Sequence, residues 1–171
     1  MRKSLIIAAL PAVLAASPAL AQSATGTVDI TGSVAGRCMF TLPNKTISLG
    51  EISLASNGKL DVSKVNGRNE TLTGWCNNTA ASMTVTSTQL TTPTAATTGF
   101  DNRVDYTATA TANSVSATDT SLTAGAGSGS TVGQFSGDIL VTLSAASSPT
   151  NGLMVAGSYT GNVQVTLTPS T

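Results

Sequence analysis

Residues 24–34 of the sequence read ATGTVDITGSV, a stretch in which small or apolar residues alternate strictly with polar ones. This period of two is typical of a β-strand with one buried face and one face in solvent. Val28, Ile30 and Val34 carry the apolar side, with Gly32 between them. The same parity continues through Gly36, Cys38, Phe40 and Leu42. The pattern therefore predicts the front half of one long ribbon, which pairs either within its own domain or with a neighbouring molecule.

The first 21 residues have the pattern of a secretory signal peptide. Arg2 and Lys3 form a basic start, residues 5–14 are mostly apolar, and Ala19-Leu20-Ala21 is a cleavage motif of the A-x-A type. The apolar stretch is short for a membrane span, which disfavours a retained anchor. We expect cleavage after Ala21 and export of the remaining 150 residues. The expected organisation is a signal peptide at 1–21, an N-terminal extension at 22–34 and a single domain at 35–171.

The composition of the mature chain excludes some classes of partner. Without Arg2 and Lys3 the chain keeps six basic against eight acidic residues, a formal charge of −2. It therefore offers no basic patch for nucleic acid or anionic lipid. No later stretch approaches the ~20 apolar residues that cross a bilayer. Threonine, serine, glycine and alanine abound, which favours strands and turns over helices.

Cys38 and Cys76 are the two cysteines of the chain. An even pair in an exported protein is most simply a disulfide. The closed loop of roughly 39 residues would contribute about 4 kcal/mol of stability in the chain-entropy model. The alternative is a pair of free or metal-binding thiols, which the absence of histidine and of a C-x-x-C motif disfavours.

Short alternating segments separated by polar turns recur along the chain, and no segment has a helical period. Strands are expected near residues 47–49, 60–65, 72–76, 83–88, 104–112, 135–143 and 159–167, and longer loops at 90–98 and 118–133. Such a pattern predicts an all-β fold. An antiparallel β-sandwich of immunoglobulin type fits it better than a barrel does.

The residues needed for catalysis are largely missing. The sequence contains no histidine, so a Ser-His-Asp or Cys-His arrangement is excluded. The acidic residues are scattered singly, and no lysine follows the glycine-rich run at 125–129 as a phosphate-binding loop requires. We therefore expect neither an enzyme nor a bound cofactor or metal.

Several of these features together resemble the subunits of bacterial chaperone–usher fimbriae. They are the signal peptide, the alternating extension before Cys38, the second cysteine, the motif ISLGEI at 47–52 and the alternating strand at 157–167. The resemblance implies an immunoglobulin-like sandwich that lacks its seventh strand. A periplasmic chaperone lends a strand, an outer-membrane usher handles export, and the extension of the next subunit then replaces the lent strand. Ser170 stands where the classical branch has an aromatic residue, and the threonine-rich composition is similar to the archaic, spore-coat-U-like branch.

The resemblance assigns roles to two sets of residues. The donor strand comprises Val28, Ile30, Gly32 and Val34, and the acceptor groove is formed with the terminal strand through Tyr159, Val163, Val165 and Leu167. The last strand ends at Pro169, so no further C-terminal strand is expected. A missing strand leaves an open edge that a neighbour can fill. The alternative is that residues 24–34 are simply the first strand of their own domain.

The expected function is a structural subunit of a fimbria on the cell surface, which supports adhesion or biofilm formation. Two other classes remain open. A secreted carbohydrate-binding or adhesive sandwich would use exposed aromatic residues such as Trp75, Phe100 or Tyr106. An ice-binding protein would use threonine ranks such as Thr107, Thr109 and Thr111, but the sequence has no fixed repeat.

Overall fold

The computed structural model describes residues 22–170, so the expected signal peptide at 1–21 lies outside the described residues. Among the described residues, 22–33 and those from Val34 onward belong to separate units. The second unit is called the domain below. It is built of strands, with one short 3-10 turn, η1 (Val62–Lys64). Between residues 22 and 170 no helix is long and apolar enough to cross a membrane.

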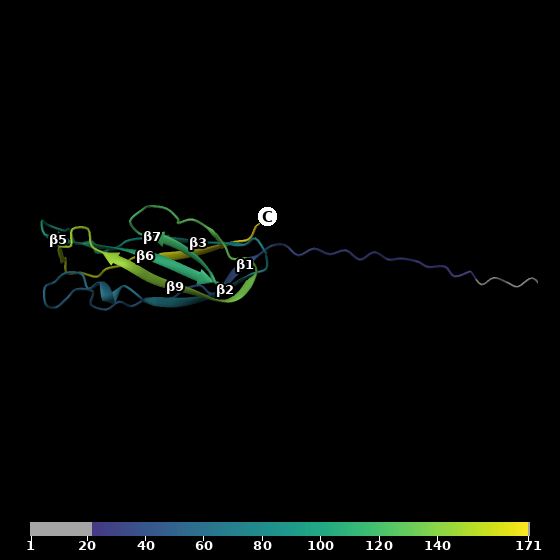
Figure 1. Cartoon of the computed structure of the whole chain (residues 1–171), viewed down its shortest axis with the longest axis horizontal. Coiled ribbons are helices and arrows are strands. Elements are labelled where there is room, and N and C mark those ends of the chain that lie inside the picture. Colours follow the sequence, from purple (N-terminus) through teal and green to yellow (C-terminus); the bar gives the residue numbers. More distant parts are fainter. Residues whose placement is uncertain (1–21, 171) are drawn as a thin grey trace, which may run out of the picture. The chain divides into compact units, whose positions relative to one another are not determined.

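The larger sheet has six strands. They are β1 (Cys38–Leu42), β2 (Asn69–Cys76), β4 (Leu90–Thr91), β6 (Arg103–Ala112), β7 (Val115–Thr120) and β9 (Phe135–Ser147). Their order is β1-β2-β9-β6-β4, and β7 also pairs with β6. All of these pairings are antiparallel. The long strands β2, β6 and β9 lie side by side at the centre of this sheet (Figure 1).

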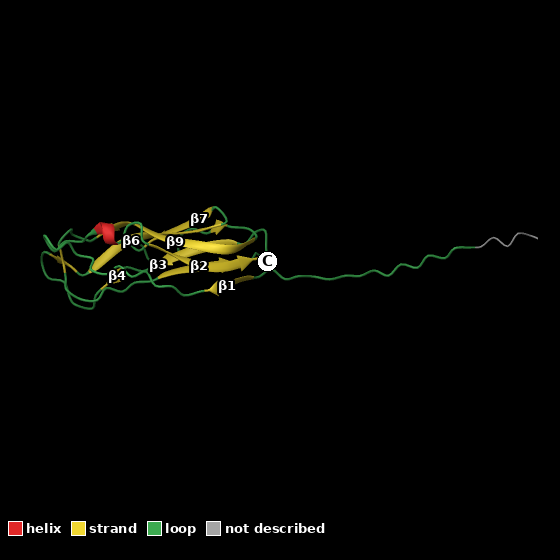
Figure 2. Cartoon of the chain, turned by 90° about the horizontal axis from the view of Figure 1, so that it is seen from below, coloured by secondary structure: helices red, strands yellow, loops and turns green. Residues whose placement is uncertain are grey.

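A smaller sheet of three antiparallel strands contributes the other side of the core. Its order is β11-β3-β8, from β3 (Ser82–Ser87), β8 (Ser130–Thr131) and β11 (Val163–Thr168). A separate parallel pair joins β5 (Phe100–Asp101) to β10 (Leu153–Met154). Figure 2 shows η1 at the end of the domain opposite the C-terminal label. The expected all-β fold is thus confirmed.

The main core takes side chains from both sheets. Met83 and Val85 of β3 are fully buried, as are Ala108 and Ala110 of β6 and Ile139 of β9. Their threonine neighbours on β3 and β6 face the other way and are partly exposed. Period-two alternation therefore identified the buried faces of these strands correctly. A smaller cluster forms around Ile52, Leu60 and Val104.

The long ribbon expected at the N-terminus is not continuous. Residues 22–37 form no strand, and the first strand begins at Cys38. A register shift between Phe40 and Leu42 then breaks the parity, which leaves Leu42 half exposed. The prediction of one ribbon through Leu42 was therefore wrong, because a bulge reverses which face each later residue occupies.

Other predicted boundaries also need correction. Residues 47–49 alternate in burial but pair with nothing as a strand, and residues 60–65 contain η1 instead of a strand. The Asp61 side chain caps that turn by accepting hydrogen bonds from the Ser63 backbone N–H and hydroxyl. The loop expected at 118–133 contains the end of β7 and all of β8. The final strand starts at Val163, four residues later than expected.

Candidate strand-binding groove

Two adjoining cavities form a groove in the domain, called the open groove below. Their volumes are about 240 Å³ and about 690 Å³. Both are lined by Thr46, Ile47, Leu49, Leu90 and Gly161. The chain at residues 45–53 forms one wall, and residues 154–163 form the other. The groove therefore separates the segment after β1 from the segment that leads into β11.

The two walls of the open groove are not joined to each other by backbone pairing. Within the described chain, β1 pairs only with β2 and β11 pairs only with β3. No bridge or backbone hydrogen bond connects residues 45–52 to residues 155–163. The groove wall at residues 45–51 and strand β11 thus both present unpaired backbone to the groove, and another strand can join such backbone.

The floor of the groove is apolar and continuous with the main core. Leu72 of β2 and Val141 and Leu143 of β9 line the first cavity from below. Five apolar side chains around the groove are only half-buried, namely Ile47, Leu49, Leu72, Leu90 and Val163. Each packs against the core on one side and leaves surface free on the other. An inserted apolar side chain would therefore extend the core.

The backbone of β11 presents its free hydrogen-bonding groups to the unpaired edge. Just before this strand, the C=O of Asn162 accepts from the Thr88 N–H at 2.8 Å, and its N–H donates to the Thr88 hydroxyl at 2.8 Å. Asn162 therefore faces β3. Because backbone direction alternates along a strand, Val163, Val165 and Leu167 direct their N–H and C=O groups away from β3. These groups can receive a further strand.

The residues predicted for the acceptor groove occupy different depths. Val163 lines the first cavity and Tyr159 lines the second. Val165 is buried in the core and Leu167 is half-buried against it, and neither lines the two cavities of the open groove. Sequence reasoning missed the opposite wall, where Ile47 and Leu49 line both cavities. Their alternation was visible, but it was assigned to an ordinary strand.

Tyr106 supports the groove from beneath. Its hydroxyl donates to the C=O of Thr88 at 2.7 Å and lies 3.2 Å from the C=O of Asn162. It thus links β6 to the two segments that flank β3 and β11. Burial, and secondly the charge of Asp119, raises the pKa of Tyr106 to about 12.

We expect the substitution Tyr106→Phe to lower the free energy of unfolding by about 1 kcal/mol near neutral pH, because one buried hydrogen-bonding group is lost. In the unsubstituted chain the folded pKa lies above the ordinary value of 10, so this tyrosine's contribution is complete below pH 10 and is lost as pH rises toward 12. Urea unfolding between pH 8 and pH 11, followed by circular dichroism, measures both effects. An equally steep alkaline loss of stability in the two chains would contradict the assignment.

The apolar side chains of the N-terminal extension are exposed. Val28 and Ile30 are 86% and 93% accessible, and Val34 at the start of the domain is 88% accessible. Residues 22–33 form no helix or strand of their own. Three large apolar side chains exposed on one parity of a short segment are unusual for a soluble chain, because isolated exposed side chains are the norm.

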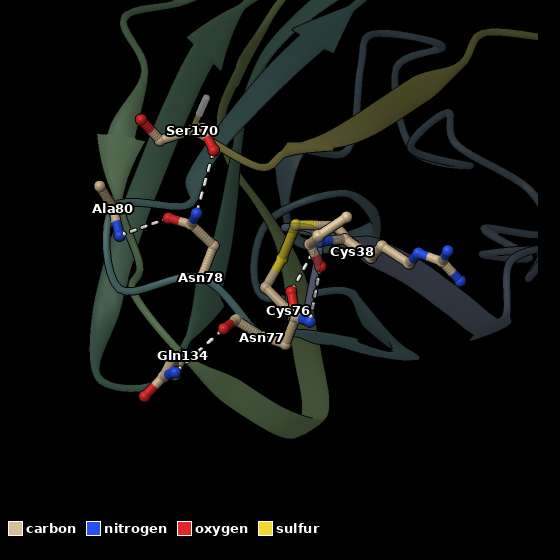
Figure 3. The surroundings of a disulfide bond; sticks show 9 residues. Cys38, Cys76, Asn77, Asn78, Ala80, Gln134 and Ser170 are labelled. Carbon is tan, nitrogen blue, oxygen red and sulfur yellow. Dashed lines mark hydrogen bonds between the residues drawn. A yellow bond between two sulfur atoms is a disulfide. The ribbon is translucent and has the colours of Figure 1, made fainter. Parts of the chain in front are cut away.

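The predicted disulfide is confirmed: Cys38 and Cys76 are bonded, with their Cα atoms 4.1 Å apart. They are also direct partners in the β1–β2 ladder. The two residues that follow Cys76 form hydrogen bonds with residues near the start and near the end of the domain (Figure 3). Asn77 holds the segment before Cys38, and the Asn78 amide donates to the Ser170 C=O at 2.9 Å.

The residues considered for other functions do not come together as a site. Tyr106 is buried, Phe100 lies in β5, and Trp75 lies in β2 between Met39 and Ser136 in the sheet register. The Thr109 and Thr111 hydroxyls of β6 are engaged by Thr118 and Ser116 of β7. Comparison of the chain with family models, with curated proteins and with solved structures finds no match.

Proposed function

We propose that the protein is a structural subunit of a surface fimbria that polymerises by donor-strand complementation. The open groove of one subunit takes up residues 24–34 of the next. The domain is then an immunoglobulin-like sandwich that lacks one strand, and the incoming segment supplies it. One observation carries the proposal: the same chain contains a groove with an apolar floor between two stretches of unpaired backbone, and an exposed segment whose apolar residues share one parity.

The two parts are chemically complementary. Burial of Val28, Ile30 and Val34 would contribute roughly 1.5–3 kcal/mol for each side chain. Val28, Ile30 and Val34 share one parity, as do Val163, Val165 and Leu167, whose free backbone groups face the unpaired edge. The contact is a case of β-augmentation. Because donor and groove are different segments of one chain type, the association is head-to-tail and grows into a filament.

The proposal also implies assembly factors and a location at the cell surface. An unfilled groove with an open edge is an aggregation hazard before assembly. A periplasmic chaperone that lends a strand removes this hazard, and an outer-membrane usher passes the subunit to the growing fibre. These two partners follow from the resemblance to chaperone–usher subunits. The fibre on the cell surface then supports adhesion or biofilm formation.

Binding of an isolated donor peptide tests the proposal. A labelled peptide of residues 22–34 is titrated with a chain that begins at Ala35, and fluorescence anisotropy reports binding. We expect Ile30→Asp in the peptide to weaken binding at least about 10- to 100-fold, because a buried apolar side chain is replaced by an unpaired charge. Thr31→Asp is the matched control. It adds the same charge at the neighbouring position, whose side chain would face solvent in the bound peptide. It should therefore change the affinity little.

Equal weakening by both substitutions would contradict the parity on which the groove assignment depends. Complete absence of binding would contradict donor-strand complementation itself. That outcome would favour a secreted, non-polymerising adhesive domain.

A further inference from the structure

The disulfide encloses one wall of the open groove. Cys38 is the first residue of β1 and Cys76 is the last residue of β2. Residues 39–75 lie between them, and this loop includes the groove wall at residues 45–53. The disulfide therefore provides a direct covalent path from the N-terminal extension to the end of β2. This path does not pass through the groove wall.

The chain before Cys38 is also fastened to the end of β2. The Asn77 side chain accepts from the Arg37 N–H at 2.6 Å and donates to the Ala35 C=O at 3.0 Å. The Asn77 N–H donates to the Arg37 C=O at 3.0 Å, and Gln134 donates to the Asn77 C=O at 2.9 Å. Figure 3 shows Asn77 beside the disulfide with Gln134 on its far side. The root of the extension is thus attached to β2 at the place where the disulfide is.

The strand after Cys38 is poorly suited to resist a pull. β1 has five residues, pairs on one side only, and has a register shift before its last partner. By contrast, all eight residues of β2 are paired with β9, which is paired in turn with β6. A pull on residue 37 without the disulfide would separate β1 from β2 one pair at a time and then displace the groove wall. With the disulfide, the same pull reaches the centre of the larger sheet through Cys76.

We infer that the Cys38–Cys76 disulfide keeps tension on the N-terminal extension away from the groove wall at residues 45–53. The inference rests on the proposed function, in which each subunit holds one neighbour's strand while its own extension is held by another. In such a fibre the pull on one contact would otherwise loosen the next. The disulfide makes a subunit's hold on its neighbour independent of the pull on its own extension.

A single-molecule experiment on the full mature chain tests the inference. The donor peptide of residues 22–34 is seated in the groove, and a constant force is applied between the peptide and the N-terminus of the chain. After in-situ reduction, or in the variant Cys38→Ser/Cys76→Ser, the lifetime of the peptide under load should shorten at least about tenfold. This corresponds to loss of the contact of one wall side chain such as Ile47. Without load the dissociation rates should be equal within error.

Moving the handle provides the control. When the same reduced molecules are pulled from the C-terminal end, no force passes through β1. The lifetime of the bound peptide should then match that in the oxidised chain pulled from the same end. Equal lifetimes in oxidised and reduced chains pulled from the N-terminus overturn the inference alone. Faster release of the peptide from the reduced chain at zero load, or with force applied at either terminus, also overturns the inference. The disulfide would then contribute to the folding of the groove itself. Failure of the oxidised chain to hold the peptide overturns the proposed function, and the inference with it.

Discussion

A mature chain that lacks residues 22–34 should form no filaments at any concentration at which the complete chain assembles. The deletion removes Val28, Ile30 and Val34, the three side chains proposed to enter the neighbouring groove. It removes no strand and no residue of either hydrophobic cluster, so the free energy of unfolding of the domain should stay within about 0.5 kcal/mol. Light scattering and electron microscopy measure assembly, and urea unfolding measures the fold.

The truncated chain should also act as a terminator. It keeps the open groove and can accept a donor, but it offers none, so one truncated molecule ends each filament that it joins. Filament length should therefore fall steeply as truncated chain is added to complete chain. A full-length variant with Val28→Ser, Ile30→Ser and Val34→Ser is the matched control for the length of the extension, and it should behave like the deletion. Fibres formed by the truncated chain alone would contradict donor-strand complementation.

Period-two alternation was a good guide where the buried face is purely apolar. The strands β3, β6, β9 and β11 were all expected from it, and apolar residues on one parity of each are buried, with Met83, Ala108, Val141 and Val165 as examples. In such strands the hydrophobic effect alone decides which face turns inward. The confirmed disulfide followed with equal directness from two cysteines in a chain expected to be exported.

β7 was missed because one of its inward positions carries a charge. Val115 and Ala117 alternate correctly, but the next inward residue is Asp119, and the segment looked like the start of a polar loop. In the fold, the Asp119 carboxylate accepts from the Ser87 N–H and hydroxyl, each at 2.7 Å. A buried charge is tolerated when hydrogen bonds satisfy it. Because Ser87 is 32 residues away in the sequence, no local pattern could indicate that partner.

The groove itself was only partly accessible to sequence reasoning. The terminal strand and the exposed extension could be identified from alternation, since each has its own apolar parity. The opposite wall could not, because Ile47 and Leu49 alternate just as a paired strand would, and only the fold shows that no partner joins them. The break of the ribbon before Cys38 was equally hidden. Just before Cys38 the chain is held by Asn77, which binds Arg37 and Ala35 from 40 and 42 residues away, so no local pattern could indicate this attachment.

Replacement of both cysteines, Cys38→Ser/Cys76→Ser, should lower the free energy of unfolding by about 4 kcal/mol through the closed loop alone. The two residues are separated by 38 positions, so the unfolded chain gains considerable freedom when the link is lost. A typical domain has a total of only ~5–15 kcal/mol, so this is the largest single effect expected here. Urea unfolding of oxidised, reduced and double-serine chains measures it, and a decrease of two mass units relative to the reduced chain verifies the bond.

Loss of the disulfide should destabilise one region of the domain more than the others. The loop contains β1 and the groove wall at residues 45–53, which has no strand partner across the groove, whereas β6 and β9 are held from both sides. Hydrogen exchange in the double-serine chain should therefore accelerate first at β1, while β6 and β9, and residues 45–53 when the donor peptide is seated, keep their protection as long as the chain is folded. Asn77→Ala is the control, since it loosens the root of the extension but keeps the disulfide. Uniform loss of protection across all strands would show instead that the disulfide stabilises the domain as a whole and has no particular role at the groove.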